Sequence, residues 1–278
     1  MSDDASITLA IDDPFVIALE RFEGDDERVV VPGHVNKIGQ RAFANNRYIR
    51  EVVLGEGITR IGDEAFASCV NLERVVIPST VREIGPGAFK GCWRLEEAVV
   101  PEGVTELPTK AFARCRSLAR LVLPESLRVI GDGCFQHCGQ VEALAFPDAL
   151  ERIGESAFHN CQKLVFDALP ASLETLEDEA FRSCAALESV DLHEGIGWVG
   201  RRCFKDCVGL RTVMLSSGVD FIEEGVFEGC SSLDAVVVPP ALSHVESRAF
   251  AGTGLARDDI AFPDGCEIAG DAFDAPSK

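Results

Sequence analysis

One pattern of apolar and polar positions recurs along nearly the whole chain. In a representative copy, the apolar positions are Ile61, Ala65, Phe66, Cys69, Leu72, Val75, Ile77 and Val81. The Phe of this copy has counterparts at a constant spacing of 23 residues (66 − 43 = 23 and 273 − 250 = 23), namely Phe43, Phe89, Phe112, Phe135, Phe158, Phe181, Phe204, Phe227, Phe250 and Phe273. A fixed period of this length predicts a solenoid built from stacked coils.

Within one copy, the pattern predicts a short strand followed by a short helical turn. Val75 and Ile77 are two residues apart and so share one face of an extended segment, which Pro78 ends. The spacing of Phe66, Cys69 and Leu72 suits one or two turns of α-helix or 3₁₀-helix. Such a unit has one apolar side that it cannot bury alone, so we expect the copies to stack in parallel register.

The pattern Leu-x-x-Val-x-Ile-Pro-x-x-Val-x-x-Ile-Gly-x-x-Ala-Phe-x-x-Cys resembles the BspA-like (Treponema-type) class of leucine-rich repeats, from about Val29 to Phe273. The resemblance implies an α/β repeat: a curved right-handed leucine-rich-repeat solenoid of about eleven 23-residue coils, with parallel strands on the concave face. It also implies a binding or adhesion role, because the family is best known from bacterial surface proteins. It carries no catalytic residue and no cofactor to transfer.

The two ends of the chain depart from the pattern. Residues 1–28 do not match the repeat, and we interpret them as an N-terminal cap that covers the open end of the first coil. Residues 29–278 then form the solenoid. Its last part, about residues 251–278, is irregular, since Thr253 stands where the earlier copies have Cys, and we interpret it as a C-terminal cap.

Eight of the eleven cysteines lie three residues after a repeat Phe: Cys69, Cys92, Cys115, Cys138, Cys161, Cys184, Cys207 and Cys230. This phase predicts an inward ladder of small buried side chains. Disulfides between coils are the alternative, but in-register side chains would give them a poor dihedral angle. Zinc is disfavoured because no C-x-x-C pair exists.

No catalytic, cofactor-binding or metal-binding residue is predicted, and we expect a protein that is not an enzyme. A thiol-dependent enzyme is the alternative from a different class. It would need a thiolate in an exposed, electropositive environment, which buried cysteines in an acidic chain do not offer.

The chain has 46 acidic and 26 basic residues, a net charge of −20. This charge disfavours nucleic acid as a partner, because a phosphate backbone needs a basic surface. It favours solubility, and either a basic protein partner or cations held diffusely. The chain contains no run of eighteen apolar residues, so we expect no membrane insertion. We also expect a monomer or weak homodimer.

The acidic start of the chain lacks the features of a secretory signal, which predicts a location in the cytoplasm. If a signal was removed upstream, the protein would instead lie at the cell surface or outside the cell.

The candidate binding surface is the concave strand face, centred on residues 158–237. Residues ten positions after each repeat Phe should point outward there and are mostly apolar, as at Val76 and Val99. Several copies in this region carry unusual outward residues, with Phe166 and Met214 expected on the strand face and Trp198 and Phe221 in loops at its border. The predicted partner-binding residues are Val165, Phe166, Asp191, His193, Trp198, Met214, Phe221 and Val237. A surface adhesin or glycan-binding module is the alternative function.

Overall fold

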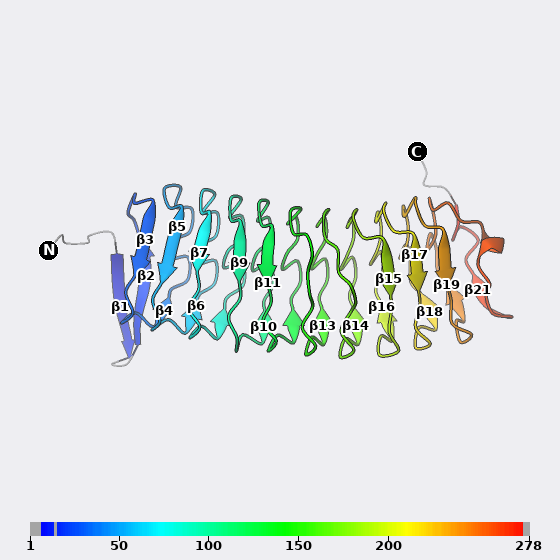
Figure 1. Ribbon diagram of the computed structural model, residues 1–278, viewed down its shortest axis with the longest axis horizontal. Helices are drawn as coiled ribbons and strands as arrows, with labels where there is room; N and C mark the ends of the chain where they lie inside the picture. Colours follow the sequence, from blue (N-terminus) through cyan, green and yellow to red (C-terminus); the bar gives the residue numbers. More distant parts are fainter. Residues whose placement is uncertain (1–6, 14–15, 275–278) are drawn as a thin grey trace. The chain divides into compact units, whose positions relative to one another are not determined.

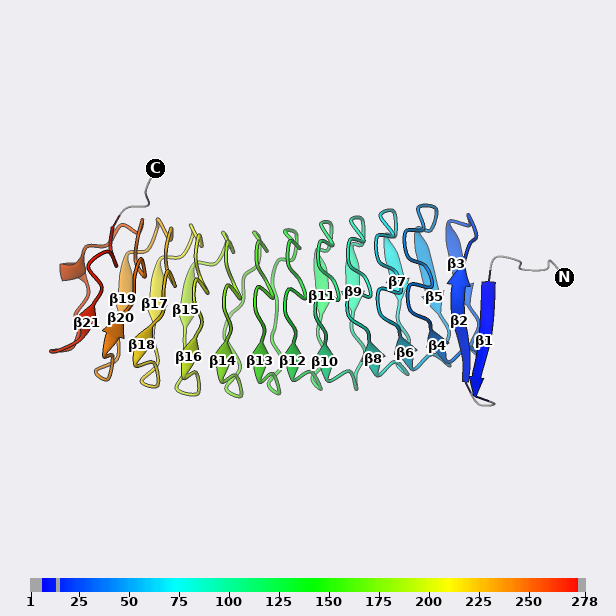
Figure 2. The same cartoon turned by 180° about the vertical axis from the view of Figure 1, so that it is seen from behind.

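The structure is a computed structural model that describes residues 7–13 and 16–274. The chain divides into two compact units, Met1–Val141 and Glu142–Lys278. Within each unit the chain winds as a parallel-strand β-solenoid, and the units together hold about eleven coils (Figures 1 and 2). The predicted repeat fold is therefore confirmed. Below, positions within a coil are counted from its repeat Phe, which is position 0.

Unit 1 contains two rows of parallel strands. The long-strand row, at positions 8 to 11, consists of β3 (Arg28–Val31), β5 (Glu51–Leu54), β7 (Arg74–Val76), β9 (Glu97–Val99) and β11 (Arg120–Val122). The short-strand row, at positions 17 and 18, consists of β4 (Lys37–Ile38), β6 (Arg60–Ile61), β8 (Glu83–Ile84), β10 (Glu106–Leu107) and β12 (Val129–Ile130). Neighbouring strands pair 23 residues apart, as Val52 does with Val75 (75 − 52 = 23).

Unit 2 has the same two rows, but its long-strand row is incomplete. It holds β15 (Ser189–Asp191), β17 (Thr212–Met214) and β19 (Ala235–Val237). The short-strand row holds β13 (Arg152–Ile153), β14 (Thr175–Leu176), β16 (Trp198–Val199), β18 (Phe221–Ile222), β20 (His244–Val245) and β21 (Glu267–Ile268). The first two coils of this unit, which contain β13 and β14, carry no long strand (Figure 1).

Two details of the predicted coil are wrong. Each regular coil has two strands rather than one, and the segment around the repeat Phe is a series of turns rather than a helix. In the part of the chain that the structure describes, the only helical segment is the 3₁₀-helix η1 (Arg257–Asp259). The turn segment alternates bonds to the next coil with bonds to itself: the Phe66 N–H donates to the Ala88 carbonyl oxygen at 2.7 Å, and the Ala67 N–H donates to the Glu64 carbonyl oxygen at 2.9 Å. Every second backbone N–H is therefore satisfied by the next coil, which prevents a continuous helix.

The core is a ladder of Phe rings, as predicted. The repeat Phe side chains from Phe43 to Phe250 are almost completely buried. In unit 1, the Phe66 and Phe89 rings stack with centroids 5.2 Å apart, and in unit 2 the Phe181 and Phe204 rings stack at 5.7 Å. Offset stacking at this spacing adds to the free energy of burying the rings, so each coil is held mainly by its two neighbours.

The predicted cysteine ladder lies beside the Phe ladder. All eight ladder cysteines are buried and free. The Cys69 thiol donates to the Phe43 carbonyl oxygen of the preceding coil at 3.0 Å, and the Cys207 thiol donates in the same way to Phe181 at 3.1 Å. The thiols therefore satisfy core carbonyl groups as well as filling space.

The N-terminal segment contains an antiparallel pair of strands that the sequence pattern does not predict. β1 (Ile7–Asp13) pairs antiparallel with β2 (Val16–Phe22), and β2 pairs in parallel with β4. The Phe22 ring stacks on Phe43 at 5.1 Å, so β2 extends the stack of coils by a strand. The division into a cap of residues 1–28 and a solenoid of residues 29–278 stays a prediction.

Candidate interaction surfaces

The outward side of the long-strand row carries an apolar row at position 10. In unit 1 this row is Val30, Val53, Val76, Val99 and Val122. In unit 2 the row consists of Asp191, Met214 and Val237, which pair side by side across β15, β17 and β19. The Met214 and Val237 residues are 51% and 55% exposed, respectively. The structure thus brings three of the predicted partner-binding residues together on one sheet.

A charged row runs beside the apolar row of unit 1, at position 8. Its members alternate in sign along the stack: Arg28, Glu51, Arg74, Glu97 and Arg120. The Arg28 guanidinium bonds to the Glu51 carboxylate at 3.0 Å, and Arg120 pairs with Glu97. Because four of these five charges pair within the chain, the apolar row is the surface on this sheet that is left for a partner to cover.

Val165 and Phe166 lie where the long-strand row is interrupted. The short strands β13 and β14 of these two coils pair normally, but in the long-strand row the pairing within the described residues is a single isolated parallel bridge between Ala143 and Val165. That bridge joins residues 22 apart (165 − 143 = 22), not 23. A slip by one residue exchanges the inward and outward faces of a strand. As a result, Val165 is exposed and the half-buried Phe166 ring turns toward the core. The centroid of the Phe166 ring lies 5.3 Å from that of the buried Phe181 ring. Phe166 thus does not point fully outward as Met214 does, but its half-buried ring still lines the surface at this point.

Asp167 provides the physical reason for the slip. It occupies position 9, where the coils of Phe43 to Phe204 otherwise carry apolar residues that point inward: Val52, Val75, Ala98, Leu121, Leu144, Val190 and Val213. An unpaired carboxylate in this core would cost several kcal/mol. The slip leaves Asp167 exposed and lets the adjacent Phe166 fill the space. A charged residue at an inward position was the signal that the sequence analysis missed.

Trp198 and Phe221 lie on the short-strand row rather than in loops. They occupy position 17 of successive coils, at the start of β16 and β18. Trp198 is 43% exposed, and the half-buried Phe221 ring stacks on His244 with centroids 5.2 Å apart. The His244 Nε2 atom lies 3.3 Å from a carboxylate oxygen of Glu267 in the next coil. These residues therefore form an aromatic row separate from the apolar row of Met214 and Val237.

His193 replaces the Pro that ends the strand in most coils, two residues after Asp191. Its Nδ1 atom accepts a hydrogen bond from the Gly195 N–H at 3.0 Å. Its Nε2 atom is buried and has no hydrogen-bond partner in the described part of the chain. The ring thus supports the turn after β15, and the structure does not bring it into the apolar row.

Comparison with known proteins agrees with this geometry. A family model described as the BspA type leucine rich repeat region, in 6 copies, matches residues 36–165 and 164–277. The chain belongs to the BspA-type leucine-rich repeat family. Comparison with the curated proteins finds no significant match.

Solved structures of other leucine-rich repeat proteins are similar to this chain. A leucine-rich repeat protein from Bacteroides ovatus is 25% identical, with 98% of this chain and 91% of that one covered and a TM-score of 0.63. The leucine rich repeat protein of T. pallidum is 26% identical, with 74% and 88% covered and a TM-score of 0.54. A leucine rich cell surface protein from Faecalibacterium prausnitzii is 23% identical, with 99% and 94% covered and a TM-score of 0.55, which shows the shared fold alone.

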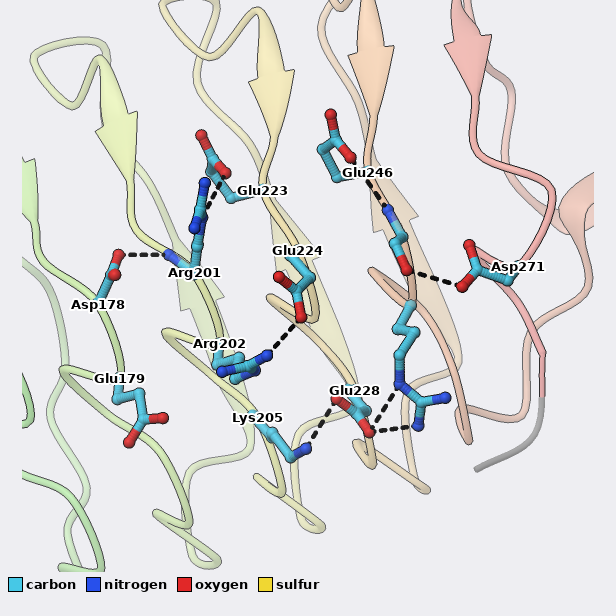
Figure 3. A network of polar contacts seen from close by, with 12 residues as sticks. Asp178, Glu179, Arg201, Arg202, Lys205, Glu223, Glu224, Glu228, Glu246 and Asp271 are labelled. Atoms are coloured by element: carbon cyan, nitrogen blue, oxygen red, sulfur yellow. Dashed lines mark hydrogen bonds and ion pairs between the residues drawn. The ribbon is translucent and has the colours of Figure 1, made fainter. Parts of the chain in front are cut away.

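A network of charged side chains covers the turns of the last BspA-type coils (Figure 3). Glu228 joins Lys205 and Arg248 in this network and is only 7% exposed. Its carboxylate accepts from Lys205 Nζ at 2.8 Å and from Arg248 Nε at 3.2 Å. Burial would raise the pKa of Glu228, but the hydrogen bonds from Arg248 and Lys205 outweigh it and hold that pKa below its ordinary value. Because these charges pair across coils, the network serves to join coils.

The cysteines of the BspA-type core are poor nucleophiles. Burial raises the pKa of Cys69 to about 12 and that of Cys184 well above its ordinary value. A thiolate is the reactive form of cysteine, so burial works against thiol chemistry here. In the described residues, no group of three or more His, Cys, Asp or Glu is arranged to hold a metal ion. Nor does any helix within that part of the chain have the length and apolar character needed to cross a membrane.

Proposed function

We propose that the chain is a non-enzymatic interaction protein that binds another protein on its long-strand face, centred on residues 158–237. The observation that carries this proposal is the exposure of Met214 and Val237, which lie side by side on β17 and β19. Methionine is among the residue types enriched at protein interfaces, and truncating a well-packed side chain at the centre of an interface is costly to binding. The −20 charge favours a basic partner, whose association it would accelerate.

The test is binding of a partner captured from the source organism, before and after truncation of the apolar row. The double variant Met214→Ala with Val237→Ala should bind at least about tenfold more weakly, which is about 1.4 kcal/mol. The matched control is Val76→Ala with Val99→Ala, at the same position of unit 1. Binding that survives the first pair, with folding intact, would contradict the proposed surface.

A surface adhesin that recognises glycans is the second candidate, and the aromatic row favours it. Trp198 is exposed and the Phe221 ring is stacked on His244, which presents flat aromatic surface beside the polar groups of the short-strand row. Such rings combine an apolar face with polar surroundings. Binding to a glycan array that is lost in Trp198→Ala but kept in Met214→Ala would favour the adhesin over the protein-binding function.

A further inference from the structure

The interrupted part of the long-strand row contains a hollow of about 500 Å³. It lies within unit 2, and its lining includes Ala145, Phe146, Phe166 and Ala168. Ala145 and Ala168 occupy position 10, where the long strands of this unit carry the larger Asp191, Met214 and Val237. The small alanine side chains, together with the absence of long strands from these two coils, leave the space open. Its volume falls within the range of pockets that bind ligands, which is about 300–1,000 Å³.

The chemistry of the lining is both apolar and acidic. Asp148 and Asp167 are exposed members of the lining, which contains no Lys or Arg. Neither aspartate forms an ion pair with any described residue, unlike Glu228 elsewhere in the same unit. Two uncompensated carboxylates beside apolar surface suit a group that has an apolar stem and a cationic head.

The aromatic rings in the lining distinguish among cationic groups. Phe146 and Phe166 are both lining residues, and their ring centroids lie 5.3 Å apart in an edge-to-face arrangement. A guanidinium group can stack on a ring while it bonds to a carboxylate through two N–H groups, whereas an ammonium group is a compact and strongly hydrated charge. The lining therefore favours arginine over lysine.

We propose that this hollow binds an arginine side chain from a basic segment of the partner protein, with Asp148 and Asp167 pairing with the guanidinium. The inference rests on the proposed function, because it names the chemistry of one group by which the partner docks. It adds a site that the apolar row of Met214 and Val237 does not include.

The probes are fluorescein-labelled peptides of equal length, in which glycine alternates with arginine, lysine, citrulline or norleucine. Citrulline has the shape of arginine without its charge, and norleucine supplies the apolar stem alone. In fluorescence anisotropy at low salt, the arginine peptide should bind at least about tenfold more tightly than the citrulline peptide, and more tightly than the lysine peptide. Equal binding of the arginine and citrulline peptides, or preference for norleucine, would overturn the proposal.

Substitutions of the lining residues test whether the arginine peptide binds in the hollow. Asp148→Asn with Asp167→Asn should weaken binding of the arginine peptide by about tenfold, and Ala168→Trp should abolish it by filling the space. The matched controls are Glu102→Gln with Glu125→Gln, which remove two carboxylates from unit 1, and Val122→Trp, at the same position as Ala168. Thermal unfolding checks that each variant is folded. An equal loss in the controls would show diffuse charge attraction and refute the site.

The two proposals fail separately. If the captured partner depends on Met214 and Val237 while the peptides show no preference for arginine, the protein-binding function stands and the arginine site is wrong. If the hollow selects arginine while partner binding ignores the apolar row, the site stands and the proposed strand-face function is wrong.

Discussion

At the scale of single residues, each turn segment requires backbone conformations that most side chains avoid. In successive coils of unit 1, the residue two positions after the repeat Phe has a positive φ: 60° at Ser68 and 76° at Gly91. A second left-handed residue occurs two positions before the Phe, as at Glu64 with φ 52°. Left-handed backbone costs a residue with a Cβ roughly 1–2 kcal/mol, whereas glycine adopts it freely.

This pair of coils allows a matched test. Ser68→Gly should stabilise the protein by about 1 kcal/mol, and Gly91→Ala should destabilise it by a similar amount. A Cβ on Gly91 would meet Ser68 Oγ at 3.5 Å, an ordinary contact, so strain rather than a clash dominates. Urea denaturation of both variants measures the changes, and shifts of the same sign in the two variants would disprove the explanation.

Glu228 supplies a second prediction, which concerns pH. Its depressed pKa means that its contribution to stability is present above the ordinary pKa of Glu, about 4.3, and is lost as pH falls through the lower folded value. Glu228→Gln should therefore cost about 1.5–3 kcal/mol at neutral pH. The difference from the wild type should shrink as the pH is lowered below 4.3. A difference independent of pH would show that the charged bonds to Lys205 and Arg248 are not its source.

At the scale of the coil, the sequence predicts the features that all copies share, such as the buried Phe and Cys ladders. It does not predict the change of strand register that a single residue causes in one coil. Period and apolar phase place the Phe and Cys ladders correctly, because burial of a large apolar side chain dominates each position. The turn segment resembles a helix in its spacing, yet bonds between coils, such as Phe66 to Ala88, take precedence. The register slip at Phe166 follows from one carboxylate, Asp167, at an inward position of the repeat, and the spacing of the Phe residues alone does not reveal it.

The slip predicts different roles for two residues that the sequence pattern treats alike. Phe166→Ala should cost about 2 kcal/mol or more, because the ring packs against Phe146 and Phe181 in the core. Met214→Ala should change stability by no more than about 0.5 kcal/mol, because its side chain is exposed. Denaturation midpoints give both values. If both substitutions changed the free energy of unfolding equally, Phe166 would have to lie on the outward face like Met214.

At the scale of the whole molecule, the excess of acidic residues opposes folding. The 46 acidic and 26 basic side chains leave a net charge of −20, and the ion pairs seen on the strands, such as Arg28 with Glu51, are exposed. Exposed pairs contribute little, while the net repulsion acts over the whole surface and is screened by salt.

Added sodium chloride should therefore raise the unfolding temperature at neutral pH, since it screens more repulsion than attraction. Scanning calorimetry across a salt series measures the effect. The control is the same series near pH 4.6, the isoelectric point, where little net repulsion remains and the effect should vanish. A fall in unfolding temperature with salt at neutral pH would show that the ion pairs outweigh the net charge.

The cysteine ladder allows local unfolding to be measured separately in each coil. Ten of its eleven thiols are buried, at least one in each coil from Phe66 to Phe227, and only Cys266 is partly accessible. An alkylating reagent should mark Cys266 first and reach each other thiol only when its coil opens locally. Peptide masses collected over time would then give the opening free energy coil by coil without an engineered label. Uniform labelling along the ladder would mean that the coils open together.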